Sequence, residues 1–488
     1  MKKLFFTFSI IIVLFFSFFA RIIYPIKISN TNNNNFLINT SSIINNNYAI
    51  ISDDINLWNN ESSVVPDIAI GNDGKIHVVW NDHTNGPWGS NSVIMYASKD
   101  TSGWSNATII SEGVEDQFSP KIAVDSNRNV HIVWANNTQG IWGNGDIFYR
   151  SYTPSQGWSE VIILSNESAT WDNDNNLAPD LAVDPSDNLH IVWQGVANGG
   201  LWGSDDEILY ITKSGQEWSN ITIISDDSDQ WNDGDSRNPS IALDSFGNDF
   251  VVWQDNTVGT GWGADWDIMF RSKTPGASVW SDVRVISDDT HDWNNDNSIH
   301  PVVAASPGGG AYFVWEDDTD GVWGTDKEIM YVYNSNSFWS NATVISDDIT
   351  KWNNDGSSNP DIVLDSDNKI HVIWEDDTDG GWGADKEIMS VSSMDRISWS
   401  TITIISDDSN LWNNGDSNNP AIAAGKDGSI HIVWDDDTNG VWGNDKEIIY
   451  RDFPGSNQNN TFPWYYIVLI AIIVIIGVGT VIYLRYKK

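Results

Sequence analysis

Residues 360–374 decide the fold: Pro360-Asp361-Ile362-Val363-Leu364 leads into the polar turn Asp365-Ser366-Asp367-Asn368, and Ile370-His371-Val372-Ile373-Trp374 follows. Short β-branched runs on either side of Asp, Ser and Asn predict a β-hairpin. An acidic loop then leads to Gly383. Glu387-Ile388-Met389-Ser390-Val391 predicts a third strand, and Trp399 to Ile405 predicts a fourth. The segment is therefore expected to form four short antiparallel strands.

The same unit, about 60 residues long, recurs seven times along the chain. Its boundary sequence Ile51-Ser52-Asp53-Asp54 returns at Ile224, Ile286, Ile345 and Ile405, with weaker copies from Ile110 and Leu164. Repeats of this kind bury their apolar faces only against neighbours. Seven four-stranded units predict an all-β, seven-bladed propeller. A β-helix would need shorter coils, and helical or leucine-rich repeats would need a 3.6-residue period that the sequence lacks.

The two ends of the repeated region predict how the ring closes. The seventh copy stops after its third strand, Glu447-Ile448-Ile449-Tyr450. The chain before the first copy, Tyr48-Ala49-Ile50-Ile51-Ser52-Asp53, has the pattern of a missing fourth strand. Pairing of this N-terminal segment with the last blade would remove a free sheet edge.

Composition limits the function classes. The 488 residues include 67 acids against 25 bases, a formal charge of -42. Such a chain repels phosphate backbones, which excludes nucleic acid as a partner and favours divalent cations or cationic partners. There is no cysteine, so disulfides and thiolate metal sites are excluded.

The termini predict a membrane protein. Lys2 and Lys3 precede an apolar run from Leu4 to Ala20, typical of a secretory signal or, because Phe18 makes a poor cleavage site, of an uncleaved anchor. The uncharged run 464–484 is about 31 Å long as a helix, and basic residues follow it as in a positive-inside tail. The expected order is a signal or anchor (1–25), an Asn-rich linker (26–45), the propeller (46–452), a stalk (453–463), a transmembrane helix (464–484) and a cytoplasmic tail (485–488). The propeller is thus expected outside the cell on a single-pass anchor, and Asn-x-Ser/Thr sequons such as Asn106, Asn220 and Asn341 agree with an extracellular glycoprotein.

The repeat resembles the blades of sialidase-like propellers, the family of the bacterial neuraminidase repeat. The shared features are a hairpin ending in Val-Val-Trp-x-Asp, a Gly turn, a Glu-Ile-x-Tyr strand and a final Trp-Ser strand. The Asp-box of that family, Ser-x-Asp-x-Gly-x-x-Trp, is degenerate: Ser98 to Trp104 comes nearest. The resemblance implies the fold over about residues 46–452. It implies no catalytic residue, because the Phe/Tyr-Arg-Ile-Pro motif is missing and Arg150, Arg271 and Arg451 share one repeat position, as scaffold residues do.

Residues that recur in each copy are expected to be structural. His77, His131, His190, His371 and His431 precede the hairpin tryptophan by three residues, where other blades use Phe250 and Tyr312, so this is a packing position. The hairpin tryptophans, Trp80 through Trp434, are expected between blades. Tryptophans in the loops are harder to explain by burial, and they suit the faces of sugars, with loop packing as the alternative. The candidates for ligand binding are Trp293, Trp323, Trp352, Trp382, Trp412 and Trp442.

Alternating acids follow the hairpin tryptophan in blades five to seven. Oxygen ligands at every second position, a glycine and a later Glu resemble an EF-hand loop, although the Glu falls one residue late and no helices flank it. Calcium is therefore the expected cofactor, and the alternative is a solvated acidic rim. The candidate ligands are Glu316, Asp318, Asp320, Glu375, Asp377, Asp379, Asp435, Asp437 and Asn439. Blades two and three lack these acids.

Together these features predict a membrane-anchored extracellular propeller that binds a surface glycan or a protein ligand, or that serves as a structural module. The alternative is a sialidase-like glycoside hydrolase or lyase with a pair of carboxylates as acid and base. The acids recur in several blades, so the sequence singles out no such pair.

Overall fold

The structure is a computed structural model, and the residues that it describes belong to one compact unit within Ser41–Lys488. They are 48–52, 61–84, 91–111, 115–137, 145–165, 172–197, 205–225, 232–258, 265–287, 296–321, 324–335, 338–347, 353, 355–379, 383–407, 413–439 and 445–455. The regular elements in these ranges are β-strands. None of the described residues forms a helix long and apolar enough to cross a membrane, and both predicted anchors lie outside them.

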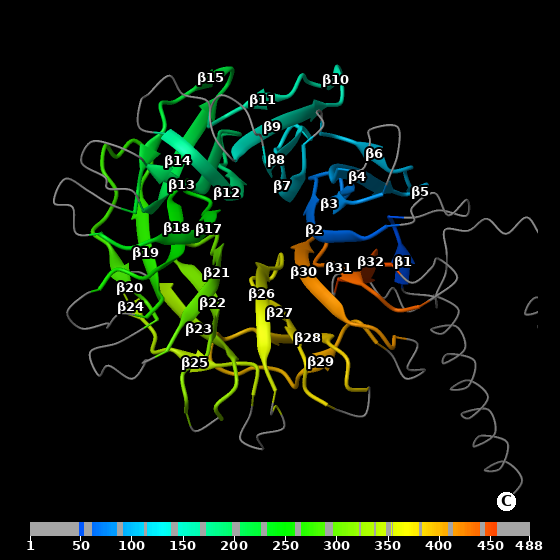
Figure 1. Cartoon of the computed structure of the whole chain (residues 1–488), viewed down its shortest axis with the longest axis vertical. Helices are drawn as coiled ribbons and strands as arrows, with labels where there is room; N and C mark the ends of the chain where they lie inside the picture. Colours follow the sequence, from blue (N-terminus) through cyan, green and yellow to red (C-terminus); the bar gives the residue numbers. More distant parts are fainter. Residues whose placement is uncertain are drawn as a thin grey trace, which may run out of the picture. The chain divides into compact units, whose positions relative to one another are not determined.

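Seven antiparallel sheets surround a central axis, as the propeller prediction requires (Figure 1). The innermost strands are Ser63–Ile70 (β2), Gln117–Val124 (β7), Asp172–Val183 (β12), Ser236–Leu243 (β17), Ser298–Ala305 (β21), Ser357–Leu364 (β26) and Ser417–Ala424 (β30). The second strands are Ile76–Asp82 (β3), Val130–Asn136 (β8), Leu189–Ala197 (β13), Asp249–Asp255 (β18), Ala311–Asp317 (β22), Ile370–Asp376 (β27) and Ile430–Asp436 (β31). The third strands are Val93–Asp100 (β4), Asp146–Thr153 (β9), Asp206–Ser214 (β14), Asp267–Lys273 (β19), Glu328–Ser335 (β23), Glu387–Ser393 (β28) and Glu447–Phe453 (β32).

The fourth strands are shorter than predicted, and most are broken in two. The pieces are Gly103–Trp104 (β5), Thr108–Ile109 (β6), Gly157–Trp158 (β10), Ile162–Ile163 (β11), Glu217–Trp218 (β15), Thr222–Ile223 (β16), Arg284–Val285 (β20), Phe338–Trp339 (β24), Thr343–Val344 (β25) and Thr403–Ile404 (β29). The serine of each Trp-Ser pair explains the break. Ser105 Oγ accepts the Ser98 N–H at 3.0 Å, and Ser400 Oγ accepts the Ser392 N–H at 3.0 Å. A side chain thus replaces a backbone partner, and the outer strand leaves the ladder.

The predicted closure of the ring is confirmed. Tyr48–Ile50 (β1) pairs antiparallel with β32, the third strand of blade seven, with Ala49 opposite Tyr450. The Tyr48 hydroxyl lies 3.2 Å from the carbonyl of Ile405 and 3.0 Å from that of Asp407, and it accepts a 2.7 Å hydrogen bond from Arg451. The first and last parts of the repeated region are therefore held together in one blade.

The apolar core lies between neighbouring blades. The side chains of the seven hairpin tryptophans are fully buried: Trp80, Trp134, Trp193, Trp253, Trp315, Trp374 and Trp434. One apolar cluster, for example, joins Val133 and Tyr149 of blade two to Leu181 and Trp193 of blade three. These observations confirm the interblade position predicted for the tryptophans, and the apolar face of each blade is thus buried against its neighbours.

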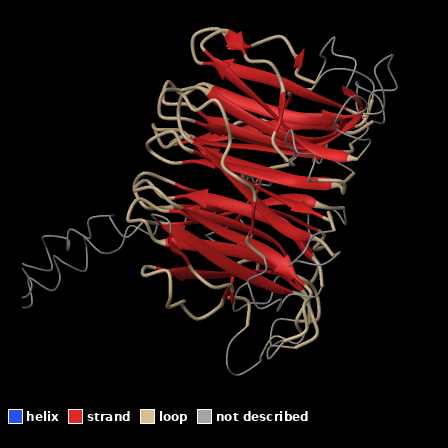
Figure 2. Ribbon diagram, turned by 90° about the vertical axis from the view of Figure 1, so that its left-hand side faces the viewer, coloured by secondary structure: helices blue, strands red, loops and turns tan. Residues whose placement is uncertain are grey.

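Each innermost strand bulges at the residue before its proline. These residues have φ near 50°, a conformation that is rare outside glycine: Val65, Ser119, Ala178, Asn238, His300, Asn359 and Asn419. The bulge turns a backbone N–H toward the preceding blade. Figure 2 shows the strands from the side, between two rims of loops. We call the end where the second strands finish the upper face, and the end with the turns between first and second strands the lower face.

Candidate functional site

The upper end of each blade is organised around its buried tryptophan. In blade six the Asp376 carboxylate accepts hydrogen bonds from Trp374 Nε1 at 2.9 Å, from Ser357 Oγ at 3.1 Å and from the Thr378 N–H at 3.0 Å. The same arrangement is centred on the aspartates of four further blades: Asp82, Asp255, Asp317 and Asp436. Burial raises the pKa of Asp317, Asp376 and Asp436. These carboxylates are hydrogen-bonded from within their own blade and are structural.

Blades two and three build the same contact with other residues. In blade two Gln117 replaces the serine and its Oε1 accepts the Trp134 Nε1–H at 2.5 Å. In blade three Asn176 accepts the Trp193 Nε1–H at 2.8 Å, and Gly195 stands where other blades have the aspartate. A Cβ at Gly195 would lie 2.5 Å from Asn176 Oδ1, so the glycine makes room for the amide. In these two blades a side-chain amide thus accepts the tryptophan N–H in place of the missing aspartate.

The first acid of each predicted calcium ladder forms an interblade clamp. Glu316 accepts the backbone N–H of Asn359 at 3.2 Å, Glu375 that of Asn419 at 2.6 Å, and Asp435 that of Val65 at 3.1 Å. Each donor is the bulged residue of the next blade. In blades three and four the amide oxygens of Gln194 and Gln254 accept the corresponding N–H groups of the next blade, each at 3.0 Å.

A lysine compensates each acidic clamp. Lys327 Nζ lies 3.0 Å from Glu316, Lys386 Nζ lies 3.3 Å from Glu375, and Lys446 Nζ lies 2.8 Å from Asp435. Blades three and four, which use glutamine, have Asp206 and Trp266 at the lysine position. The acids are therefore unevenly distributed around the ring because blades five to seven use an acidic clamp paired with a lysine, whereas blades three and four use a neutral glutamine.

The other ladder residues lie away from their clamp acid. Asp318 Oδ2 is 3.4 Å from Asn297, and Asp437 Oδ1 accepts the Asp416 N–H at 2.6 Å. The remaining four are exposed at the upper face: Asp320, Asp377, Asp379 and Asn439. Within the described ranges no group of three or more His, Cys, Asp or Glu side chains is arranged to hold a metal. Calcium at these nine residues stays a prediction.

The six tryptophans predicted to bind ligand lie outside the described residues: Trp293, Trp323, Trp352, Trp382, Trp412 and Trp442. The residues predicted to be scaffold are confirmed. His131 Nδ1 is 2.8 Å from the Tyr149 hydroxyl within blade two, and His431 Nδ1 is 2.7 Å from that of Tyr450. Arg271 donates to the Ile224 carbonyl of the preceding blade at 3.0 Å. The histidine contacts thus lie within one blade, and the arginine contact joins two neighbouring blades.

A second set of acids, at the start of the third strand, is fully buried. Glu328 and Glu387 are 0 % exposed. Burial, together with the charges of nearby aspartates, raises the pKa of each carboxyl to about 8. Their sequence context, Asp-Lys-Glu, is visible in the repeat, but the sequence does not reveal that the glutamate points inward while the lysine reaches the clamp acid.

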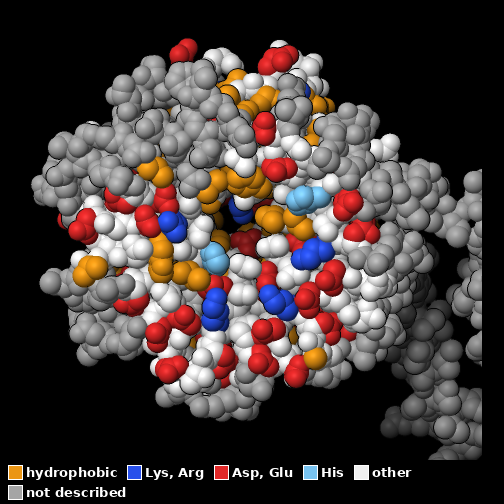
Figure 3. Space-filling view, in the orientation of Figure 1, with side chains coloured by type: hydrophobic (Ala, Val, Ile, Leu, Met, Phe, Trp, Pro, Cys, Tyr) orange, Lys and Arg blue, Asp and Glu red, His pale blue; other side chains and the backbone are white. Residues whose placement is uncertain are grey.

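Among the described residues, three aspartates and one lysine of the innermost strands interact electrostatically around the central axis, which we call the axial channel. Asp67, Asp180 and Asp361 each follow the proline of an innermost strand, and each accepts a backbone N–H of the next blade, at 2.7, 2.9 and 2.9 Å. Lys121 Nζ lies 3.8 Å from Asp67. Burial in the channel, partly offset by Lys121, raises the pKa of Asp361 to about 7. Figure 3 shows the opening in the middle of one face, with lysine and arginine side chains around it and acidic ones further out.

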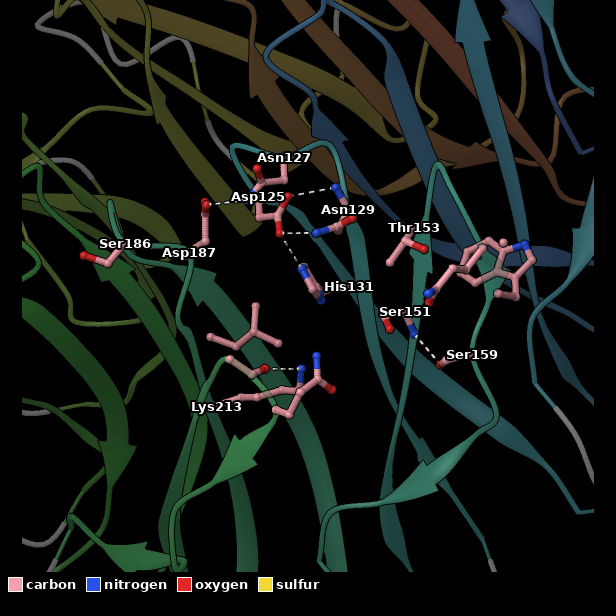
Figure 4. A pocket seen from close by; sticks show the side chains of 16 residues that line it. Asp125, Asn127, Asn129, His131, Ser151, Thr153, Ser159, Ser186, Asp187 and Lys213 are labelled. Carbon is pink, nitrogen blue, oxygen red and sulfur yellow. Dashed lines mark hydrogen bonds and ion pairs between the residues drawn. The ribbon is translucent and has the colours of Figure 1, made fainter.

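A groove of about 480 Å³ opens on the lower face between blades two and three (Figure 4). Four turns and strand ends form it, two from each blade. The lining residues are Asp125, Asn127, Asn129, His131, Ser151, Thr153, Gln156, Gly157, Trp158, Ser159, Ser186, Asp187, Leu189, Lys213, Gly215 and Gln216. Sequence patterns indicate no ligand site at these residues, because they belong to turns and strand ends whose composition looks ordinary.

The two carboxylates of the groove are held by neighbours. Asp187, with φ 63°, accepts the Ser126 N–H at 2.8 Å and Asn127 Nδ2 at 2.7 Å, which joins the turn of blade three to that of blade two. Asp125 accepts Asn129 Nδ2 at 2.7 Å. Burial raises the pKa of Asp125, but hydrogen bonds from His131 and Asn129 outweigh it, so the pKa is lowered overall. Asp125 is therefore a hydrogen-bond acceptor at neutral pH and a poor proton donor.

Lys213 supplies positive charge to the groove. Its ammonium donates to the Gly215 carbonyl at 2.9 Å. Burial lowers its pKa, and the charge of Asp125 opposes that shift. The groove thus combines a partly desolvated ammonium, amide donors and acceptors, two carboxylates and the indole of Trp158.

No protein-family model and no curated protein sequence matches the chain. Solved structures with a similar fold include a polysaccharide lyase of the ulvan lyase family PL25 (12% identity, TM-score 0.49, 82% of this chain and 95% of that one). They also include an α-L-arabinanase from Penicillium chrysogenum (9%, 0.47, 84% and 98%) and a leech intramolecular trans-sialidase (10%, 0.44, 87% and 72%). At these identities the likeness concerns the fold, and no activity follows from it.

Proposed function

We propose that this chain is a binding module displayed outside the cell on a membrane anchor, and that the groove between blades two and three receives part of a hydroxyl-rich ligand such as a surface glycan. The observation that carries the proposal is the groove itself. Its volume of about 480 Å³ lies within the range of small-ligand sites, roughly 300–1,000 Å³. The anchor rests on the apolar run 464–484.

The lining of the groove suits sugar hydroxyls. Asn127, Gln156 and Gln216 offer both donors and acceptors, Asp187 offers acceptors, and Lys213 offers donors. Trp158 adds an apolar surface, which a sugar ring can cover. A few polar groups placed around an aromatic side chain give orientation as well as affinity.

The protonation states favour binding over glycoside hydrolysis. A general acid for that reaction needs a raised pKa and access to the glycosidic oxygen. Raised carboxyl pKa values in the described part of the chain include about 7 for Asp361 and about 8 for Glu328 and Glu387. The first lies in the axial channel, and the other two are fully buried.

The test is a glycan array probed with the full chain in detergent, followed by titration of any bound glycan. Replacing Lys213 with Met should weaken binding about tenfold or more, because a hydrogen bond to a charged donor is lost. Lys273→Met is the matched control, since Lys273 holds the same position in blade four outside the groove. It should leave affinity unchanged.

A panel of fluorogenic glycosides separates binding from turnover. We expect no hydrolysis or elimination. Turnover that Asp187→Asn abolishes would instead establish the groove as a hydrolase or lyase site. An array without hits, or equal losses in the Lys213 and Lys273 variants, would contradict the proposed groove.

A further inference from the structure

The third strand of blades five and six begins with a glutamate that has one unused oxygen. Glu328 Oε2 accepts the hydroxyl hydrogen of Ser346 at 2.5 Å, and Glu387 Oε2 accepts that of Ser406. The other oxygen, Oε1, is buried in both residues and has no hydrogen-bond partner. A buried carboxylate oxygen without a partner is costly, so it needs an explanation.

An aspartate with the same property lies two residues earlier. Asp326 Oδ1 accepts the Thr325 N–H at 3.1 Å, whereas Oδ2 of Asp326 and of Asp385 is buried without a partner. The charge of Asp326 acts on Glu328, and that of Asp385 acts on Glu387. Each blade thus has two acids, two residues apart, that act on each other electrostatically, and each acid has one buried oxygen without a hydrogen-bond partner.

The lysine between the two acids does not neutralise them. Lys327 and Lys386 extend to the clamp acids Glu316 and Glu375, at 3.0 and 3.3 Å. The lysine of each Asp-Lys-Glu sequence is therefore already paired with the clamp acid and not with its two acidic neighbours. When both acids of the buried pair are ionised, the lysine does not compensate their negative charge.

Blade one shows that the fold does not require these acids. Val93 occupies the position of the glutamate, opposite Asp82, and Asn91 that of the aspartate. The serine contact still forms there: Ser111 Oγ accepts the Ile94 N–H at 3.0 Å, as Ser346 Oγ accepts that of Ile329 at 2.8 Å. The acids of blades five and six are thus additions to a framework that is complete without them.

We propose that the pairs Asp326–Glu328 and Asp385–Glu387 each bind one divalent cation, with Ca²⁺ as the best match. Carboxylate oxygens are hard ligands, and two of them balance the charge of the ion. Ca²⁺ tolerates irregular coordination and takes the rest of its six to eight oxygens from backbone carbonyls and water, whereas Mg²⁺ demands a near-ideal octahedron. The same two unused oxygens in two separate copies of the repeat support a site in each.

Calorimetric titration of the chelator-treated full chain in detergent with CaCl₂ tests the proposal. The wild type should bind Ca²⁺, and its melting temperature should rise by roughly 2–5 °C, because a ligand of the native state alone stabilises it. The variant E328Q/E387Q keeps the shape and the serine contacts. It should bind two fewer ions per chain, lose most of the calcium-dependent shift, and melt higher than the wild type in chelator, since the repulsion is gone.

The control is D320N/D379N, which removes two exposed acids of the same blades that the EF-hand-like pattern predicts as ligands. It should keep both the stoichiometry and the shift. A wild type without calcium binding would overturn the proposal. So would an unchanged stoichiometry in E328Q/E387Q, or a loss that appears in the control instead. If E328Q/E387Q misfolds, D326N/D385N gives the same comparison, because the aspartates are less buried.

Discussion

At the scale of single residues, the chain replaces charged contacts by neutral ones without changing the backbone. Glu375 of blade six, which is paired with Lys386, and Gln194 of blade three each accept the N–H of the bulged residue in the next blade. A charged clamp needs its lysine, because a buried carboxylate without a cation is strongly destabilising. A neutral clamp needs none.

This equivalence predicts the result of a double substitution. Lys386→Met should lower stability by about 1–2 kcal/mol, less than for a fully buried pair because the side chain of Lys386 is 36% exposed. Adding Glu375→Gln should restore most of the loss, since it recreates the clamp of blade three. Thermal melting of the single and double variants measures this. A double variant no more stable than K386M would contradict the interpretation.

The axial aspartates predict a second residue-level effect, on pH dependence. The folded pKa of Asp361 is about 7, above its ordinary value of 3.8, so the folded state holds the proton more tightly than the unfolded state. Protonated Asp361 therefore stabilises the folded state fully below the unfolded pKa of 3.8, and this stabilisation is lost as the pH rises through about 7. Asp67, Asp180 and Lys121 face the same channel.

Asp361→Asn should remove that loss. We expect the variant to be more stable than the wild type by roughly 1–3 kcal/mol at about pH 8, and to lose the advantage near pH 4. The amide keeps an oxygen for the Ile422 N–H. Melting curves from about pH 4 to pH 8 provide the comparison, and parallel curves for the two proteins would refute the assignment.

At the scale of the strands, the ring depends on β1. The Tyr48 hydroxyl joins the N-terminal strand to Arg451 of β32 and to backbone carbonyls of blade six. Tyr48→Phe should cost about 1–2 kcal/mol, because it removes the half-buried hydrogen bond to the Arg451 guanidinium while the ring still packs on Trp434. Denaturant unfolding measures the effect. Tyr333→Phe, a half-buried ring away from the closure, is the control and should change stability by less than about 0.5 kcal/mol.

The strands also show what a sequence can predict. Periodicity, the spare strand before the first copy and the missing fourth strand of the last copy are enough to predict the seven blades and their closure, because the hairpin pattern repeats in every blade. The broken fourth strand was not predicted, since a serine hydroxyl competes with the ladder only in three dimensions. The clamp was missed for a similar reason. Glu375 and its donor Asn419 belong to different blades, and alternation along β27 does not tell which neighbour the carboxylate meets.

At the scale of the whole molecule, the topology predicts which face lies near the membrane. The chain leaves blade seven at Phe453, at the lower end of β32, and at most about 35–40 Å of extended chain separates it from Pro463 and the predicted helix 464–484. The lower face, with the groove between blades two and three, should therefore lie toward the bilayer. The acidic upper face should point outward.

Energy transfer from a protein label to a lipid dye tests this orientation in reconstituted vesicles. The chain lacks cysteine, so Ser366→Cys in a lower turn and Asp379→Cys at the upper face each provide one exposed attachment point. The label at residue 366 should transfer energy more efficiently than the label at 379. Such a result would restrict the ligand of the groove to molecules that reach the space beside the membrane. The reverse order would show that the segment 464–484 does not anchor the propeller as predicted, and it would open the groove to ligands from outside.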